Sequence, residues 1–123
     1  QWMIFPKTGA ADETGVGNLL NVPLARGTKG DRFRQVFDEQ VIPALDAFAP
    51  EILFISAGFD AHVADTVGGL KLVDSDFDYV TGLLADVADK HAKGRLVSVL
   101  EGGYNPRALA SSVASHLRVL MSR

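Results

Sequence analysis

The 123-residue sequence contains no cysteine, which excludes a disulfide and a thiolate metal site. A metal site in this chain would therefore have to use aspartate, glutamate or histidine. No apolar run approaches the roughly 20 residues that span a bilayer, and the first residues lack the basic start and small-residue cleavage pattern of a signal peptide. The absence of cysteine says little about the compartment, and we expect a cytoplasmic chain without a membrane partner.

Basic residues are also scarce, with 12 lysines and arginines against 15 aspartates and glutamates. The net charge of −3 creates no strong basic field, so we expect no nucleic-acid partner. A hydrophobic share of 47% and a charged share of 22% are typical of a globular chain, and the length allows one domain at most. Because position 1 is not methionine, we expect a fragment of a longer protein.

The most informative stretch runs from Ile52 to His62. Its unbroken apolar start predicts a strand that is buried on both faces. Small residues at 56–58 then end the strand, and Asp60 follows at the carboxyl end, where open α/β sheets bind ligands. A carboxylate there can serve as a metal ligand or an acid–base group, or it can simply stabilise a turn.

Apolar periodicity predicts alternating helices and strands after a first segment that glycine and proline interrupt. The predicted elements are a short edge strand at 18–24, a helix at 31–48, a strand at 51–56, a helix at 76–92, a strand at 95–100 and a helix at 106–121. From residue 31 onward this order is typical of a parallel sheet with right-handed helical crossovers. Both strands would then end at the same edge of the sheet.

Three local signals refine these helices and the connection between the strands. Asp31 is the expected N-cap of the first helix, and Pro43 predicts a kink or a short first turn within it. Asp74 or Ser75 is the expected cap of the second helix. The loop that precedes it is of roughly 20 residues, a length that is usually functional inside a compact domain.

A second candidate site follows the second strand, at Gly102-Gly103-Tyr104. The two glycines allow the backbone to approach a ligand closely, and the phenol of Tyr104 can donate a hydrogen bond to a developing oxyanion. A tight turn with a packed aromatic ring is the alternative. The third glycine of a dinucleotide fingerprint is missing, which makes nucleotide binding a weaker hypothesis.

Three histidines and one further aspartate complete the polar candidates. His62 can chelate a metal together with Asp60, or it can lie outside the ligand set, which is the interpretation that we favour. Asp65 can orient its loop through backbone hydrogen bonds or border a pocket. His91 and His116 lie near the carboxyl ends of predicted helices, where compensation of the helix dipole is the simpler explanation.

The sequence resembles the carboxyl-terminal third of the zinc-dependent histone deacetylase superfamily, in particular its class II branch with the bacterial deacetylase-like proteins and the acetylpolyamine amidohydrolases. The likeness covers nearly the whole chain. It is carried by Ser56-Ala57-Gly58-Phe59-Asp60-Ala61-His62, Asp65, Gly68-Gly69-Leu70 and Leu100-Glu101-Gly102-Gly103-Tyr104-Asn105, with further similarity at Phe5-Pro6-Lys7-Thr8-Gly9 and Asn21-Val22-Pro23-Leu24.

The resemblance implies a three-layer α/β/α fold with a parallel sheet, arginase/deacetylase-like, of which residues 1–123 would form the carboxyl-terminal part. It implies that Asp60 is the third zinc ligand and that Tyr104 hydrogen-bonds the substrate carbonyl. Gly102 and Gly103 would line the channel for the acylated side chain. The expected substrate is an acetylated lysine or polyamine, and the expected cofactor is zinc.

The remaining ligands of the family, an aspartate and a histidine, have no counterpart upstream of Asp60, because His62 is the first histidine of the chain. The histidine pair that acts as base and acid is missing as well. We therefore expect no deacetylase activity from the isolated fragment, and pairing through exposed sheet edges, as in a homodimer. A non-catalytic α/β module that serves as a scaffold or assembly surface is the alternative.

Overall fold

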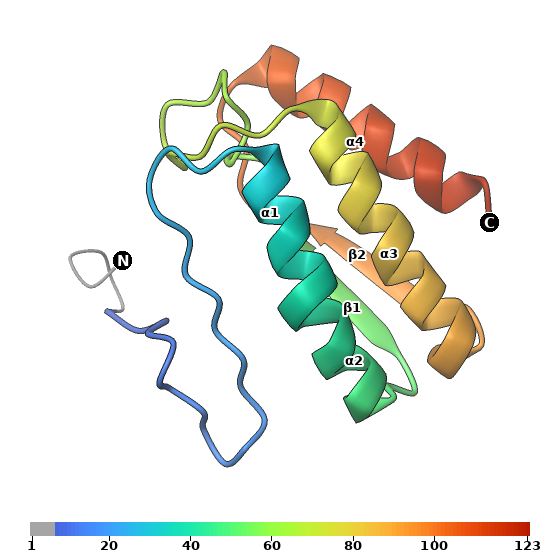
Figure 1. The fold of residues 1–123 in the computed structure, drawn as a ribbon. Helices are drawn as coiled ribbons and strands as arrows, with labels where there is room; N and C mark the ends of the chain where they lie inside the picture. Colours follow the sequence, from blue (N-terminus) through green and yellow to red (C-terminus); the bar gives the residue numbers. More distant parts are fainter. Residues whose placement is uncertain (1–6) are drawn as a thin grey trace.

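The computed structural model describes residues 7–123, so the part of the family-like segment at Phe5-Pro6 lies outside the described residues. Figure 1 shows the order of the elements. They are α1 (Gly30–Val36), the π-helical turn η1 (Phe37–Val41), α2 (Ile42–Phe48), β1 (Leu53–Ala57), α3 (Asp74–Ala92), β2 (Leu96–Leu100) and α4 (Pro106–Met121). No helix within residues 7–123 combines the length and the apolar character that a bilayer crossing needs.

The first predicted helix is continuous from α1 through η1 to α2. Pro43 has no N–H and its ring crowds the carbonyl one turn earlier, so a regular α-helical turn is unfavourable there. The chain accommodates this with the wider turn at Phe37–Val41, which ends two residues before the proline. The expected N-cap was wrong, because Lys29 takes that place and Asp31 lies within the first turn.

The two strands form a parallel sheet with Leu53 beside Leu96 and Ala57 beside Leu100. α3 connects them, which confirms the predicted order of strand, helix and strand with parallel pairing. Neither Asp74 nor Ser75 is the N-cap of α3, since the helix already begins at Asp74 after Val73. The Val73 N–H instead donates to Oδ2 of the buried Asp76 at 2.9 Å, so a carboxylate inside the first turn replaces the expected cap.

The predicted strand at 18–24 is wrong, since this segment is irregular in the structure. Pro23 lacks an N–H to donate to a ladder, and a lone short strand has little to pair with. The segment runs as an extended chain beside α1 and α2 in Figure 1. Most of its residues are exposed, including Leu19 and Leu20.

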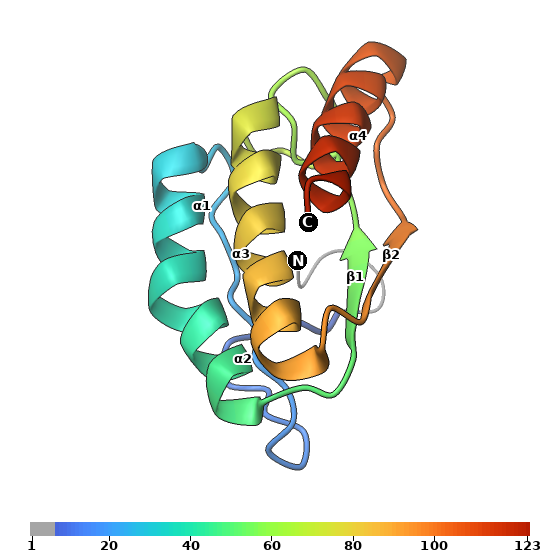
Figure 2. The ribbon, with the colours of Figure 1, turned by 90° about the vertical axis from the view of Figure 1, so that its right-hand side faces the viewer.

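The described helices cover one face of the sheet, as Figure 2 shows. On that face Leu53 packs against Ala88 and Ala92 of α3, and Ala57 lies in a cluster with Phe59, Leu72 and Phe77. The prediction that β1 is buried on both faces does not hold for residues 7–123. The opposite face of the sheet is open among these residues, with exposed fractions of 66% for Phe54 of β1 and of 41% and 53% for Val97 and Val99 of β2.

Two layers are therefore present in the described part of the chain, one sheet and one layer of helices. They form part of the expected three-layer α/β/α arrangement. The carboxyl ends of both strands lie at the same edge of the sheet, because the strands are parallel and in register. This edge carries both sequence motifs, the one that ends in Asp60 and the one that ends in Tyr104.

Candidate functional site

Backbone hydrogen bonds connect the loop that follows β1 with the loop that follows β2, immediately after the two strands end. Glu101 N–H donates to the Ala57 carbonyl at 3.0 Å, and Phe59 N–H donates to the Gly102 carbonyl at 2.8 Å. These bonds extend the pairing of the strands by one step on each side. They bring Asp60 against the first glycine of the second loop.

Asp60 is half-buried, and its carboxylate lies over Gly102. A Cβ atom on Gly102 would stand 2.7 Å from Oδ1 and 2.8 Å from Cγ of Asp60, closer than real Cβ contacts. A Cβ atom on Gly58 would stand 3.3 Å from the same Oδ1. The carboxylate therefore occupies space that two glycines leave free, one from each loop.

Gly103 adopts a φ of +140°, a backbone conformation that residues with a side chain rarely take. A Cβ atom there would also stand 2.7 Å from Cδ1 of Leu109 in α4. The backbone conformation therefore favours glycine at this position, and a side chain would in addition force Leu109 to move. The turn delivers Tyr104 to the surface, where the residue is 63% exposed.

Asp65 is the buried carboxylate of this region, with an exposed fraction of 8%. Its Oδ2 accepts from the N–H of Tyr104 at 2.7 Å and of Asn105 at 3.0 Å. Its Oδ1 accepts from the N–H of Val67 at 2.8 Å. The bonds from Val67, Tyr104 and Asn105 hold the pKa of Asp65 below its usual range, since they favour the ionised form.

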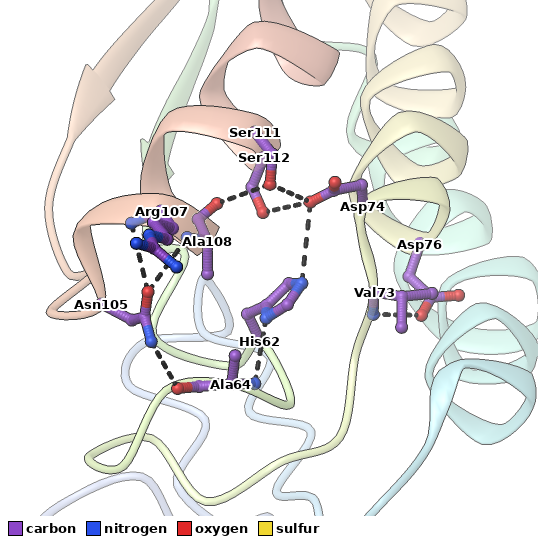
Figure 3. Close-up of polar contacts among 10 residues, drawn as sticks. All are labelled: His62, Ala64, Val73, Asp74, Asp76, Asn105, Arg107, Ala108, Ser111 and Ser112. Atoms are coloured by element: carbon purple, nitrogen blue, oxygen red, sulfur yellow. Dashed lines mark hydrogen bonds and ion pairs between the residues drawn. The ribbon is translucent and has the colours of Figure 1, made fainter.

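Asn105 makes a further connection between the loops, drawn in Figure 3. Its side-chain amide donates to the Ala64 carbonyl at 2.9 Å. Its Oδ1 accepts from the N–H groups of Arg107 and Ala108, which makes Asn105 the N-cap of α4. The loop after β1 is thereby attached to the first turn of α4.

His62 makes its contacts within the loop and toward α3 (Figure 3). Its Nδ1 accepts from the Ala64 N–H at 3.0 Å, so Nε2 carries the proton in the neutral ring. Nε2 lies 3.7 Å from Oδ1 of Asp74, and the ring stacks parallel to Phe77 with centroids 6.5 Å apart. Both ring nitrogens thus have neighbours other than Asp60, which favours the interpretation that His62 lies outside the ligand set.

His116 is buried at 5% exposure, which contradicts the predicted role in compensating the helix dipole. Thr81 Oγ1 donates to the Phe77 carbonyl and so accepts from His116 Nδ1 at 2.7 Å. His116 Nε2 pairs with Ser98 Oγ of β2 at 2.9 Å. Burial lowers the pKa of His116, because desolvation disfavours the charged ring.

His116 also packs edge-on against Phe59, with ring centroids 5.7 Å apart. It therefore supports the loop residue that directly precedes Asp60. A sequence signal for this burial exists, since Ala108, Ser112 and Ser115 are small residues at helical spacing on the same face of α4. His91, in contrast, lies at the end of α3 and pairs with Asp46 at 2.8 Å.

The residues at this edge do not form a complete metal site by themselves. Within residues 7–123 no group of three or more histidines, aspartates or glutamates lies close enough to hold a metal ion. The hydrogen bonds of the loop engage His62 and Asp65 and leave the Asp60 carboxylate available as one oxygen ligand. The arrangement thus fits one member of a ligand set and one hydrogen-bond donor, Tyr104.

Comparisons with known proteins identify the family to which the chain belongs. The family profile of the histone deacetylase domain matches residues 1–120. The chain is 44% identical over 108 residues to a type-2 histone deacetylase 2 of Dictyostelium discoideum, which covers 85% of the chain and 6% of that protein. It is 40% identical over 101 residues to a histone deacetylase-like amidohydrolase of Pseudomonas aeruginosa, covering 80% of the chain and 27% of that protein.

Solved structures share the fold and extend well beyond it. The crystal structure of the HDA15 HD domain matches with a TM-score of 0.86 at 33% identity, over 97% of this chain and 34% of that one. The histone deacetylase Clr3 matches with a TM-score of 0.84 at 26% identity, over 96% of this chain and 20% of that one. The chain thus spans about a third or less of these proteins, and it belongs to the histone deacetylase domain family.

Proposed function

We propose that this chain is the carboxyl-terminal part of a zinc-dependent deacetylase domain that hydrolyses acetyl-lysine or acetylpolyamine amides. The observation that carries the proposal is the contact between the Asp60 carboxylate and Gly102, which brings a metal-ligand type and the loop of a phenol donor to one edge of the sheet. The family membership supports the same assignment. Proteins of this family generally depend on zinc.

Each residue of the site has a distinct part in the proposed reaction. Asp60 supplies one carboxylate to the metal, and Gly102 and Gly103 line the channel for the acylated side chain. The Tyr104 phenol donates a hydrogen bond to the carbonyl oxygen as negative charge develops on it, an interaction worth about 3 kcal/mol in the transition state. Zinc in the complete site would polarise the amide carbonyl and lower the pKa of its bound water.

The isolated chain is proposed to be inactive. Catalytic zinc needs three protein ligands, and residues 7–123 hold no group of three candidate ligands. The other ligands and the base would come from the part of the domain that lies outside this chain.

A non-catalytic module is the second candidate, and the open sheet face favours it. Phe54, Val97 and Val99 place large apolar side chains in solvent on one surface, which is typical of an interaction site. Within residues 7–123 each strand of the two-stranded sheet pairs only with the other, so each has one edge without a partner strand. A homodimer that pairs through these edges and covers the open sheet face is the expected assembly in that case.

The deciding experiment measures deacetylation by a complete deacetylase domain that contains this chain. We would assay an acetyl-lysine peptide and an acetylated polyamine, with zinc content determined in parallel. Asp60→Ala should abolish both zinc retention and turnover. Asp86→Ala is the matched control, because Asp86 lies on the exposed side of α3 at 62% side-chain exposure, and it should leave both unchanged.

Two results would count against the proposal. A complete domain that retains zinc yet hydrolyses neither substrate would exclude the deacetylase assignment. Full zinc retention in Asp60→Ala would exclude the assignment of Asp60 as a ligand. The first of these results would also support the scaffold interpretation.

A further inference from the structure

The direction of the Tyr104 side chain depends on how the backbone of this residue is held. The residue is 63% exposed, so little packing around the ring can aim the phenol. A hydrogen-bond donor that serves a transition state must be held to within a fraction of an ångström, and a 1 Å error can cost roughly 100-fold in rate. Something other than the ring must therefore fix the position of this residue.

The backbone of Tyr104 is held from the other loop. The Oδ2 atom of Asp65 accepts from the N–H of Tyr104 at 2.7 Å and from that of Asn105 at 3.0 Å. These bonds span 39 and 40 positions of the sequence, so they are purely tertiary. Asp65 is itself buried and fixed by the Val67 N–H on its other oxygen.

The same carboxylate connects the two functional groups of the site. Asp65 follows Asp60 in the loop after β1, and it binds the residue that carries the phenol in the loop after β2. Asn105 adds a parallel connection through the Ala64 carbonyl. These hydrogen bonds therefore fix the distance between Asp60, the proposed metal ligand, and Tyr104, the proposed phenol donor.

We propose that Asp65 is a positioning residue, which holds Tyr104 at a fixed place relative to Asp60 by accepting the N–H groups of Tyr104 and Asn105. This inference rests on the proposed deacetylase function. Asp65 touches neither substrate nor metal and acts through Tyr104. An ionised carboxylate suits the task, because all of its bonds come from N–H donors.

The kinetic test is a double-mutant cycle in the complete domain. Asp65→Ala should lower kcat by roughly 10- to 100-fold with little change in KM, since only a transition-state contact is misplaced. Tyr104→Phe should lower kcat as well. If Asp65 acts through Tyr104, Asp65→Ala should cause little further loss in the Tyr104→Phe background, whereas a general structural role would make the two losses multiply.

Asp76→Ala is the matched control. Asp76 is also a buried aspartate, at 3% exposure, whose carboxylate accepts a backbone N–H, that of Val73. It lies on α3 and makes its bonds to Val73 and Arg34, away from Tyr104. Asp76→Ala should lower the melting temperature and leave kcat of the folded enzyme unchanged. Asp65→Asn, which keeps one acceptor oxygen, should give a smaller loss of kcat than Asp65→Ala.

Amide hydrogen exchange of the 123-residue chain tests the contact without reference to activity. The Tyr104 and Asn105 amides should be protected, and Asp65→Ala should speed their exchange at least 10-fold while the Val73 amide stays protected. Asp76→Ala should speed exchange of the Val73 amide and leave the Tyr104 and Asn105 amides protected. Unprotected Tyr104 and Asn105 amides, or exchange that ignores Asp65→Ala, would overturn the inference.

The two levels of proposal can fail separately. Absence of turnover in the wild-type complete domain would remove the deacetylase function, and the exchange pattern would still show whether Asp65 holds Tyr104. Normal turnover with multiplying losses in the double-mutant cycle would remove the positioning role and leave the deacetylase function intact.

Discussion

The Asp60 carboxylate lies where a side chain at Gly102 would begin, since a Cβ atom on Gly102 would stand 2.7 Å from Asp60 Oδ1. The two residues come from loops that follow different strands. The glycine is therefore part of the candidate metal site, although it has no side chain that could bind a metal. Its contribution is the space that it leaves for the carboxylate.

Gly102→Ala should displace the Asp60 carboxylate and lower zinc affinity of the complete domain by roughly 10- to 100-fold, the scale for loss of support to a metal ligand. Competition with a zinc chelator would measure the change. Gly82→Ala is the control, because its Cβ would meet only Arg123 Nη2 at 3.6 Å in an open part of α3. Gly82→Ala should raise helix stability by about 0.5–1 kcal/mol and leave zinc affinity alone; equal zinc affinities for both variants would contradict the site.

Tyr104→Phe should lower kcat of the complete domain by roughly 100- to 1,000-fold through loss of one donor to the oxyanion. The melting temperature should not change, because the residue is largely exposed. Tyr79→Phe removes a phenol that donates to Asp38 on the helical side of the molecule, and it should leave kcat unchanged. A Tyr104→Phe enzyme with wild-type kcat would remove this residue from the mechanism.

Thr81→Val should destabilise the chain by about 1–3 kcal/mol, the cost of a buried donor without an acceptor. The substitution keeps the shape of the side chain and leaves His116 Nδ1 without its partner. Urea unfolding at pH 7.5 measures the effect. Thr28→Val removes an exposed hydroxyl that donates to the Ala25 carbonyl, and it should cost less than the buried change; similar losses for the two variants would argue against the buried network.

The pKa of His116 is lowered by burial, so the folded chain binds this proton less readily than the unfolded chain. Stability from the neutral ring is fully present above the unfolded pKa of about 6.5 and is lost as the pH falls below it. Urea unfolding between pH 7.5 and pH 5 should show this loss. The slope should be smaller in His116→Gln, which cannot be protonated; an unchanged slope would assign the effect to other groups.

Phe54→Asp should weaken self-association of the 123-residue chain if the open sheet face takes part in a homodimer. Phe54 is 66% exposed on that face, and a buried charge there would be unfavourable. Sedimentation velocity over a range of concentrations would measure the change. Val16→Asp is the control, because Val16 is 95% exposed in the amino-terminal segment outside the sheet. A wild-type chain that stays monomeric throughout would exclude the dimer.

Local patterns predicted most of the fold. The helix at 106–121 was predicted at its observed bounds, and both strands were predicted to within two residues at either end. The apolar spacing that predicts each of these elements and the residues that mark its ends lie close together in the sequence. The predicted strand at 18–24 and the cap at Asp31 were wrong, because a strand needs a partner and a cap depends on the exact first turn.

The sequence alone determined that a carboxylate and a phenol each follow an apolar strand and that a helix lies between the two strands, since local residue patterns encode these elements. Such a helical crossover is typical of parallel strands in one sheet. Only the tertiary structure decided that Asp65 binds the Tyr104 loop and that His116 is buried between Thr81 and Ser98. These contacts join residues far apart in the chain, and no periodic pattern encodes which distant backbone N–H a carboxylate will meet. The packing of α4 against α3 and β2 brings His116 between its two partners, and the meeting of the two loops brings Asp65 to the Tyr104 N–H.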